Sequence, residues 1–223
     1  MEGVPVDEET FAVVVEPVRL ASGQVLAFQA PHVAPFYLLT AKALRDAAEP
    51  RRQAALTETL TTPDGQLRPS EPAASFDALE GLAIAVILSA AAIESHANDA
   101  IGRLDETASI TVKRRGIEVV YERDSMVRQL GLDEKVGEAV PMLTGREPIK
   151  GRVPWEKYRS ITRLRNDLVH PKREAQADPD NPGPFGRLLL CEGSTAPEDA
   201  ASVIEALEPG WIPPHVRPLM GLE

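Results

Sequence analysis

The chain has 223 residues and a mass of 24.2 kDa, a size that fits one domain with appendages or two small domains. Hydrophobic residues make up 43% and charged residues 26%, which is close to globular averages and excludes a wholly disordered chain. Aromatic residues make up only 4%, so we expect a core of Ala, Leu, Val and Ile, which favours helices. The single cysteine, Cys191, excludes an internal disulfide and a Cys-cluster zinc site, and it suits a reducing cytosol.

The formal net charge of −10 is unevenly distributed along the chain. Residues 1–100 carry 14 acids and 6 bases, residues 101–173 carry 11 acids and 16 bases, and residues 174–223 carry 9 acids and 2 bases. Nine of the bases but only three of the acids lie in Gly145–Arg173. A polyanion would be steered to this basic segment, although a basic, solvated helix face gives the same pattern.

The first 60 residues predict a β-hairpin followed by a helix. Strand-like residues at Phe11–Val15 and Val25–Gln29 flank a turn. Apolar residues at helical intervals predict a helix over Phe36–Ala48, which Pro50 ends or kinks and Arg51–Leu60 can continue.

The middle of the chain predicts a loop, a long central helix and shorter elements. Thr61–Ala74 contains three prolines and a glycine and is expected to be a loop. Ser75 is a good N-cap for a long helix that runs to about Leu104. The middle of this helix is apolar on nearly every side, which is typical of a helix surrounded by others. Ile117–Leu130 is an amphipathic stretch, and Asp133–Leu143 is a candidate short helix.

The last third of the chain contains a well-marked helix and then changes in composition. Trp155–His170 is predicted to be helical, with a proline at its first turn and another directly after it. Beyond it the sequence is acidic and proline-rich. Arg187–Cys191 is a candidate short strand, Ala196–Glu208 a candidate small helix, and the final residues are expected to be irregular. The pattern as a whole predicts a helical bundle with a minor β element.

Two segments bear on where the protein is found. Met1–Thr10 is acidic rather than basic, which is not the pattern of a signal peptide. Leu79–Ile93 is the most apolar run, but it contains Glu80 and Gly81 and is too short to span a bilayer. We therefore expect a soluble, cytoplasmic protein with no membrane partner.

The helix predicted over Trp155–His170 carries the most informative side chains. Its buried stripe is expected to consist of Tyr158, Ile161, Leu164 and Leu168. Arg165, Asn166 and His170 lie off that stripe. Asn166 and His170 are four residues apart, so their side chains can share a hydrogen bond. Arg165 and His170 are roughly 140° apart around the helix, so they can flank one groove only if a second helix or a second copy supplies the other wall.

These three side chains suit an RNA cleavage that needs no metal. The His170 imidazole can take a proton from a ribose 2′-hydroxyl or return one to the leaving 5′-oxygen. The Arg165 guanidinium can bind the phosphate in bidentate fashion, and the Asn166 amide can orient the imidazole or donate to a phosphate oxygen. Cleavage of this kind proceeds through a 2′,3′-cyclic phosphate. One helix is too sparse for it, whereas two facing copies supply two histidines and two arginines.

The string Arg-Asn-Asp-Leu-Val-His at residues 165–170 resembles the Arg-x4-6-His signature of the HEPN superfamily, in its Arg-Asn-x-x-x-His form. Upstream, Glu94 and Asn98 are similar to the Glu-x-x-x-Asn pattern of many relatives. The resemblance covers residues 75–173. It implies a mostly α fold with a HEPN-like four- to five-helix bundle over residues 36–173. This bundle would follow a short β-hairpin extension at 1–35 and precede an acidic, proline-rich, irregular appendage at 174–223 with one short helix.

The resemblance also implies a function. Members of the superfamily dimerise so that two motifs form one ribonuclease site. Many are toxins or antiphage-defence effectors, often beside a nucleotidyltransferase-like antitoxin. It thus implies an endoribonuclease without cofactor or metal, with RNA as substrate, a homodimer as the active form, and an antitoxin or other protein as a partner. The implied residues fall into three groups: catalytic, Arg165, Asn166 and His170; supporting, Glu94, Asn98 and Asp167; RNA-binding, Arg163, Lys172 and Arg173.

Each of these residues also has a plainer explanation. His170 can be an ordinary residue at a helix C-terminus, where its cationic form is favoured. Arg165 and Asp167 can be surface ion-pair partners of little energetic value. Glu94 is at least as easily a structural partner of an arginine as a catalytic group, because a buried carboxylate must be paired or protonated. Asn98 can simply hold helices together.

Two other functions are open from the sequence: an inactive HEPN-like module that only dimerises or binds a partner protein, and a helical transcriptional regulator. The intact Arg-Asn-x-x-x-His set argues against the first, because a dead scaffold has no need of it. Against the second, no two-helix unit with a short turn and a basic recognition helix is visible. No His, Asp or Glu set has metal-ligand spacing, and His96 is expected at the surface or an interface rather than as a ligand.

Overall fold

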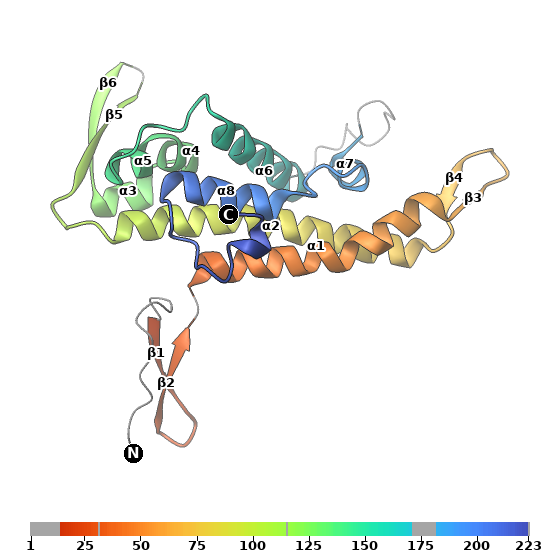
Figure 1. Cartoon of the computed structure of the whole chain (residues 1–223), viewed down its shortest axis with the longest axis horizontal. Coiled ribbons are helices and arrows are strands. Elements are labelled where there is room, and N and C mark those ends of the chain that lie inside the picture. Colours follow the sequence, from red (N-terminus) through yellow and green to blue (C-terminus); the bar gives the residue numbers. More distant parts are fainter. Residues whose placement is uncertain (1–13, 31, 115, 171–181, 223) are drawn as a thin grey trace.

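The computed structural model describes residues 14–30, 32–114, 116–170 and 182–222, and within these the chain is mostly helical (Figure 1). The helices are α1 (Val33–Thr57), α2 (Pro72–Gly102), α3 (Arg123–Gln129), α4 (Leu132–Glu134), α5 (Val140–Leu143), α6 (Val153–Val169), α7 (Pro184–Leu189) and α8 (Ala196–Leu207). A π-helical segment, Lys135–Ala139, joins α4 to α5, and a 3-10 turn covers Pro218–Met220. Antiparallel hairpins pair β1 (Val14–Arg19) with β2 (Val25–Ala30), β3 (Thr59–Thr61) with β4 (Leu67–Pro69), and β5 (Ser109–Arg114) with β6 (Ile117–Glu122).

The helices α1 and α2 run side by side as a long antiparallel pair, joined at the far end by the small hairpin β3–β4 (Figure 1). This hairpin occupies the segment that was expected to be a loop. α1 continues past the exposed Pro50 instead of ending there. α2 begins at Pro72, whose fixed φ suits the first helical turn, so Ser75 lies inside the helix and is not its N-cap. The two helices approach closely at Gly81, where an added Cβ would lie 3.0 Å from the Cβ of Ala48.

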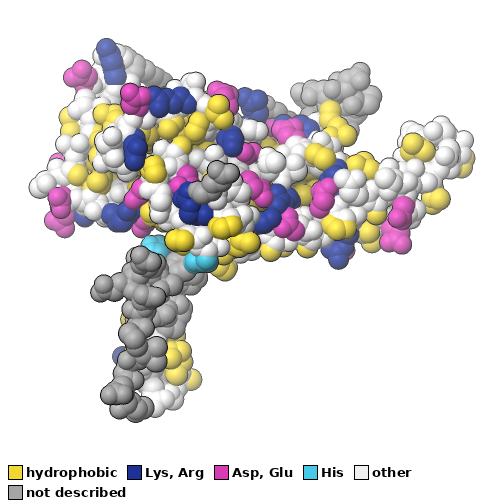
Figure 2. Space-filling view, viewed as in Figure 1, with side chains coloured by type: hydrophobic (Ala, Val, Ile, Leu, Met, Phe, Trp, Pro, Cys, Tyr) yellow, Lys and Arg dark blue, Asp and Glu magenta, His cyan; other side chains and the backbone are white. Residues whose placement is uncertain are grey.

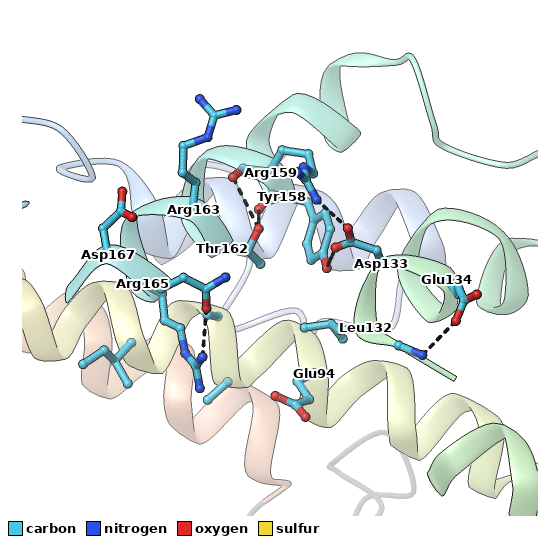
Figure 3. Close-up of a pocket in the computed structure, with 15 residues that line it drawn as sticks. Glu94, Leu132, Asp133, Glu134, Tyr158, Arg159, Thr162, Arg163, Arg165 and Asp167 are labelled. Carbon is cyan, nitrogen blue, oxygen red and sulfur yellow. Dashed lines mark hydrogen bonds and ion pairs between the residues drawn. The ribbon is translucent and has the colours of Figure 1, made fainter. Parts of the chain in front are cut away.

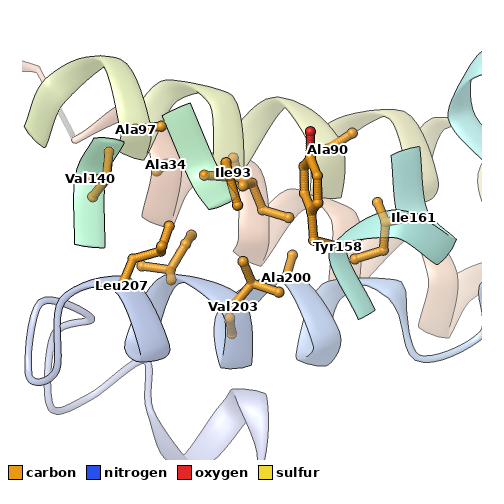
Figure 4. Close-up of a cluster of buried hydrophobic side chains, with 14 of the residues drawn as sticks. Ala34, Ala90, Ile93, Ala97, Val140, Tyr158, Ile161, Ala200, Val203 and Leu207 are labelled. Carbon is orange, nitrogen blue, oxygen red and sulfur yellow. The ribbon is translucent and has the colours of Figure 1, made fainter. Parts of the chain in front are cut away.

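The hydrophobic core lies where α2, α1, α6 and α8 meet (Figure 4). Ile93 of α2, Tyr158 of α6 and Val203 of α8 are all almost completely buried. Small residues of α2 such as Ala90 and Ala97 let the other helices pack against it closely. Burying one large apolar side chain stabilises a fold by roughly 1.5–3 kcal/mol. The side chains buried at this junction therefore contribute much of the free energy that stabilises the packing of the four helices.

The small helix predicted over Ala196–Glu208 is confirmed as α8. It forms one wall of this core, whereas the sequence predicts it within an appendage. Its buried face consists of five residues with no exposed surface: Ala200, Ala201, Val203, Ile204 and Leu207. Bidentate arginine–carboxylate pairs connect both ends of α8 to the long helices. Arg45 of α1 donates to both oxygens of Glu198 at 2.7 and 2.8 Å, and Arg103, directly after α2, donates to both oxygens of Glu208 at 2.9 and 2.5 Å.

Two short segments differ from the sequence-based prediction. The amphipathic stretch Ile117–Leu130 is divided between strand β6 and helix α3, and β6 pairs with β5 across a turn in which Gly116 has a φ of +86°. Such a φ suits glycine, which has no Cβ. The apolar run Arg187–Cys191 is not a strand, because most of it belongs to α7, which starts at Pro184. A short apolar run does not by itself distinguish strand from helix.

The N-terminal hairpin β1–β2 is confirmed over the described residues, and residues 11–13 of the expected first strand lie outside them. The hairpin projects away from the helices (Figure 1). Its apolar side chains Val18, Leu20, Val25 and Leu26 are exposed. Because these side chains are exposed, the strands gain little from packing on the rest of the described chain. An isolated two-stranded hairpin is only marginally stable in water.

By length and composition alone, α2 is long and apolar enough to cross a membrane. Half of its most apolar stretch is buried inside the fold, where α1, α6 and α8 pack on it. The core helix of a soluble protein passes the same test, and Glu80 and Glu94 of α2 are exposed. The packing around α2 is thus consistent with a soluble protein.

Candidate functional site

A groove with a volume of about 810 Å³ lies between α2, α6 and the start of α4; we call it the α2–α6 groove (Figure 3). Its lining comes from three stretches of chain: Ile87, Ala90, Ala91 and Glu94 of α2; Gly131, Leu132, Asp133 and Glu134 around α4; and Tyr158, Arg159, Thr162, Arg163, Arg165, Asn166 and Asp167 of α6. The α2 residues are spaced by three to four positions or are neighbours, so they share one face. The volume is within the ~300–1,000 Å³ typical of ligand sites.

The packing of α6 directs the Arg-Asn pair into this groove. Of the predicted stripe, Tyr158, Ile161 and Leu164 are buried, whereas Leu168 is only half-buried. Arg165 and Asn166 follow directly after that stripe and line the α2–α6 groove. The Nη1 of Arg165 donates to the Oδ1 of Asn166 at 2.9 Å, and in Figure 3 Arg165 extends from α6 toward α2. This hydrogen bond uses one of the five N–H donors of the guanidinium and leaves the others for a ligand.

His170 lies outside the groove. It is the C-cap of α6, with φ −126° and ψ 62°, and only its backbone N–H bonds to Asn166, at the carbonyl oxygen, 2.8 Å away. The side chain is exposed and is not part of the groove lining. The i,i+4 spacing brings side chains together only while the backbone is helical, and the helix ends before His170. One copy of the chain therefore unites Arg165 with Asn166 but does not bring His170 to them.

Glu94 and Asn98 have different surroundings, although both lie on α2. Glu94 lines the α2–α6 groove and is exposed, and among the described residues its carboxylate has no hydrogen bond and no ion pair. Asn98 is engaged: its Oδ1 accepts a hydrogen bond from the Nζ of Lys135 at 2.7 Å. Lys135 is almost completely buried and also donates to the carbonyl of Val127 at 2.7 Å. Asn98 thus fastens the π-helical segment to α2.

The Lys135 ammonium is a buried charge beside the groove. Burial lowers the pKa of Lys135, and the nearby Glu94 carboxylate partly offsets that effect. The sequence gives no clear signal for this arrangement, because Lys135 directly follows the acidic residues Asp133 and Glu134 and resembles part of a solvated charged stretch. Sequence reasoning therefore missed this lysine.

A second residue missed from the sequence is Asp133, which joins α4 to α6. The hydroxyl of Tyr158 donates to the Oδ1 of Asp133 at 2.6 Å, and the Arg159 guanidinium pairs with the other carboxylate oxygen. Burial, together with this hydrogen bond to a carboxylate, raises the pKa of Tyr158. The phenol therefore stays protonated and acts as a structural donor that fixes the far wall of the α2–α6 groove.

The remaining predicted site residues are at the rim of the groove or beyond it. Asp167 lines the groove, and its carboxylate pairs with Arg187 of α7 at 2.5 Å. Arg163 is exposed at the rim, and Figure 3 shows its side chain directed away from α2. Lys172 and Arg173, predicted to bind RNA, lie outside the described residues.

Much of the charge of the basic segment is neutralised locally. Four of its bases pair with carboxylates: Lys150 with Glu138, Arg152 with Glu147, Lys157 with Asp199 and Arg159 with Asp133. Figure 2 shows Lys and Arg side chains interspersed with Asp and Glu on one face of the molecule. Among the described bases of this segment, Arg146, Arg163 and Arg165 have no carboxylate partner, and two of these three line the α2–α6 groove.

His96 is buried rather than at the surface, contrary to the expectation from the sequence. None of its surface is exposed, and neither ring nitrogen has a hydrogen-bond partner within the part of the chain that the structure describes. Trp211, from the segment after α8, covers it with the two ring centroids 4.5 Å apart. The Nε2 atom lies 3.8 Å from an oxygen of Glu208, which Arg103 already holds. Burial lowers the pKa of His96 from 6.5 to about 4, so the imidazole is neutral near pH 7.

Within the described ranges, no three His, Cys, Asp or Glu side chains are grouped so as to hold a metal ion. Comparisons with protein-family models, curated proteins and solved structures find no match for this chain.

Proposed function

We propose that the chain is a metal-independent endoribonuclease of the HEPN type, which cleaves RNA at a site shared by two copies. The observation that carries this proposal is the state of Arg165. Its guanidinium lies in an open groove, beside the Asn166 amide, and no carboxylate neutralises it among the described residues. A guanidinium in this state can hold a phosphate through two parallel hydrogen bonds.

The reaction divides among the three motif residues. The ribose 2′-hydroxyl attacks the adjacent phosphorus, the bond from phosphorus to the 5′-oxygen breaks, and the products are a 2′,3′-cyclic phosphate and a 5′-hydroxyl. His170 takes the proton from the 2′-hydroxyl or gives one to the departing 5′-oxygen. Arg165 offsets the negative charge that develops on the phosphate oxygens. Asn166 holds Arg165 in place through the hydrogen bond between their side chains.

The position of His170 accounts for the need for a second copy. Its imidazole is exposed at the tip of α6 and outside the groove of its own chain. A partner copy that packs tip to tip could bring its own His170 to the phosphate held by Arg165. The protein would then act in the cytoplasm as a toxin or an antiphage-defence effector, held in check by an antitoxin or another protein partner.

A cleavage assay in EDTA tests the mechanism. Purified protein is incubated with end-labelled RNA, and the products are analysed for 2′,3′-cyclic phosphate ends. The substitution His170→Ala should reduce cleavage by ~10²–10⁴-fold, and Arg165→Ala should cost a similar factor, because residues that act as a unit are not additive. Cleavage that survives His170→Ala, or that requires a divalent ion, would contradict the proposal.

Matched controls separate loss of chemistry from loss of fold. His215→Ala removes an exposed histidine outside the groove, and Arg51→Ala removes an exposed arginine of α1. Both controls should keep full cleavage. If two copies share one site, cleavage per chain should also fall on dilution, in step with the dimer fraction measured by analytical ultracentrifugation.

A second candidate function is an inactive module that binds a partner protein or a second copy. The separation of His170 from Arg165 within one chain favours it, as do the exposed apolar side chains of the β1–β2 hairpin. In that case the chain would dimerise or bind its partner normally but would cleave no RNA at any concentration, with or without divalent ions.

A further inference from the structure

We infer that the α2–α6 groove binds a guanine nucleotide, with Glu94 reading the edge of the base and Arg165 holding the adjoining phosphate. The inference rests on the proposed function for the substrate class, because it names which nucleotide of an RNA strand this groove would accept. It makes Glu94 a specificity-determining residue rather than a support for the catalytic side chains.

Four carboxylates line the groove, and three of them are already engaged by the protein. Asp133 accepts a hydrogen bond from Tyr158 and pairs with Arg159. Glu134 accepts a hydrogen bond from the backbone N–H of Gly131 at 2.9 Å. Neither of these two carboxylates is therefore free to bind a ligand with both of its oxygens.

The third engaged carboxylate is Asp167, which pairs with Arg187. Glu94 is the fourth, and across the described residues it makes neither a hydrogen bond nor an ion pair. The buried Lys135 directs two of its three donors to Asn98 and the carbonyl of Val127 and makes no ion pair with Glu94. Glu94 is thus the groove carboxylate whose two oxygens are open to a ligand.

The other groups of the groove complement a nucleotide in their chemistry. Arg165 and Glu94 both line it, and both are seen over α2 in Figure 3. Apolar side chains of α2 and α4 also line the groove: Ile87, Ala90, Ala91 and Leu132. A ligand that fits has a negative group for Arg165, a flat apolar body for the lining, and hydrogen-bond donors for Glu94. A nucleotide has this composition.

The Watson–Crick edge of the base decides which nucleotide suits Glu94. Bases of single-stranded RNA expose this edge to side chains. On it guanine presents two adjacent donors, N1–H and the 2-amino group, which match the two oxygens of a carboxylate. Adenine, cytosine and uracil each place at least one acceptor beside a single donor group there, and an acceptor would face the Glu94 carboxylate. Guanine is therefore the base that Glu94 favours.

Equilibrium binding of 5′-mononucleotides to the full-length wild-type chain tests this without requiring cleavage, because these probes have no internucleotide bond. Isothermal titration calorimetry is run with GMP, IMP and AMP. A well-placed bidentate contact discriminates by roughly 5- to 150-fold, so GMP should bind that much more tightly than AMP. IMP, which lacks the 2-amino group, should lie between them.

The variant Glu94→Gln should bind GMP and AMP about equally, since the amide places a donor against the donors of guanine. This variant should still fold, because Glu94 makes no hydrogen bond and no ion pair among the described residues and the substitution removes only its electrostatic attraction to Lys135. Glu80→Gln, the same change at an exposed position of α2 outside the groove, should keep the full preference. Arg165→Ala should weaken all three nucleotides alike, because a phosphate contact carries no base information.

Equal affinity for GMP and AMP in the wild type, a preference that survives Glu94→Gln, or no binding of any nucleotide at millimolar concentration would each overturn the inference. The nuclease proposal is tested separately by the cleavage assay, so either hypothesis can be contradicted while the other is supported. A guanine preference that depends on Glu94 in a chain that cuts no RNA supports the inference and contradicts the nuclease. Cleavage abolished by His170→Ala in a chain that does not distinguish GMP from AMP supports the nuclease and contradicts the inference.

Discussion

Acid should destabilise this protein through His96, and the structure gives the size of the effect. The imidazole is completely buried, and neither nitrogen has a hydrogen-bond partner among the described residues. Burial lowers its pKa to about 4, against 6.5 when unperturbed. Between these two values the unfolded chain binds a proton that the folded chain does not. The contribution of the neutral His96 to the free energy of unfolding is therefore fully present above about pH 6.5, and it is lost as the pH falls toward 4.

The magnitude follows from the two pKa values. One pKa unit corresponds to about 1.4 kcal/mol, so the full loss is about 3 kcal/mol. About 1 kcal/mol should be lost by about pH 5.5, and about 2–3 kcal/mol by about pH 4.5. Against the typical ~5–15 kcal/mol stability of a native protein, this is a large fraction from one side chain.

The assay is urea-induced unfolding followed by circular dichroism at about pH 7.5, 5.5 and 4.5, with His96→Leu as the comparison. Leucine preserves an apolar contact with Trp211 but cannot bind a proton. The difference between the two proteins isolates His96 from carboxylates that also titrate in acid. Glu49 is one of these, although its hydrogen bonds to Arg52 lower its pKa to about 2. If the two free energies of unfolding decline in parallel with pH, the reasoning is refuted.

Three further outcomes test the packing and the walls of the groove. Gly193→Ala should reduce the free energy of unfolding by about 2–4 kcal/mol, because its Cβ would lie 2.8 Å from side chains in the core at a φ of +80°. The control Gly210→Ala has the same φ but nothing within 4 Å, so urea titration should show a loss of only about 1–2 kcal/mol. Tyr158→Phe removes the hydrogen bond to Asp133 and should cost about 1–3 kcal/mol in the same assay. Lys135→Met leaves two acceptors without their donor and should lower the melting temperature, and an unchanged value would show that this buried ammonium contributes nothing to stability.

The elements with strong local signals were predictable from the sequence. α6 is the clearest case, because Pro154 opens it, its apolar residues recur at helical intervals, and the prediction over Trp155–His170 differs from α6 by only a few residues. Three of the four residues of the predicted buried stripe, Tyr158, Ile161 and Leu164, are confirmed as buried, and the fourth, Leu168, is half-buried near the end of the helix. Hydrophobic periodicity over four turns is a robust signal, because residues three or four positions apart share one face of a helix but would fall on both faces of a strand.

Short elements and one helix boundary were not predictable in the same way. α7 and β6 contain only six residues each, too few for their period to distinguish a helix from a strand. Ser75 is a good N-cap by residue type, yet Pro72 opens the helix three residues earlier. The core position of α8 was not predictable from composition, because residues 174–223 are acidic as a whole while the buried apolar residues of α8 lie on one face of the helix.

The groove itself depends on contacts between residues far apart in the sequence. The pattern of α6 indicates that Arg165 and Asn166 face away from the core, but not that Asp133 and Leu132 provide the opposite wall. His170 shows the limit of spacing rules, which hold only where the helix continues. The burial of His96 depends on Trp211, which joins it only when the segment after α8 folds back over α2.

The packing of α8 against α6 and α2 has a consequence for synthesis. Translation delivers α6 before α8, so for a time the nascent chain holds its Arg165 helix with one side of the core still missing. Chain segments that share a core fold together. We therefore expect α6 to reach its final packing only after Leu207, the last residue of α8, has left the ribosome. A chain halted short of this point would lack the helix that packs against both α6 and α2, so the walls of the α2–α6 groove would not yet have their final support.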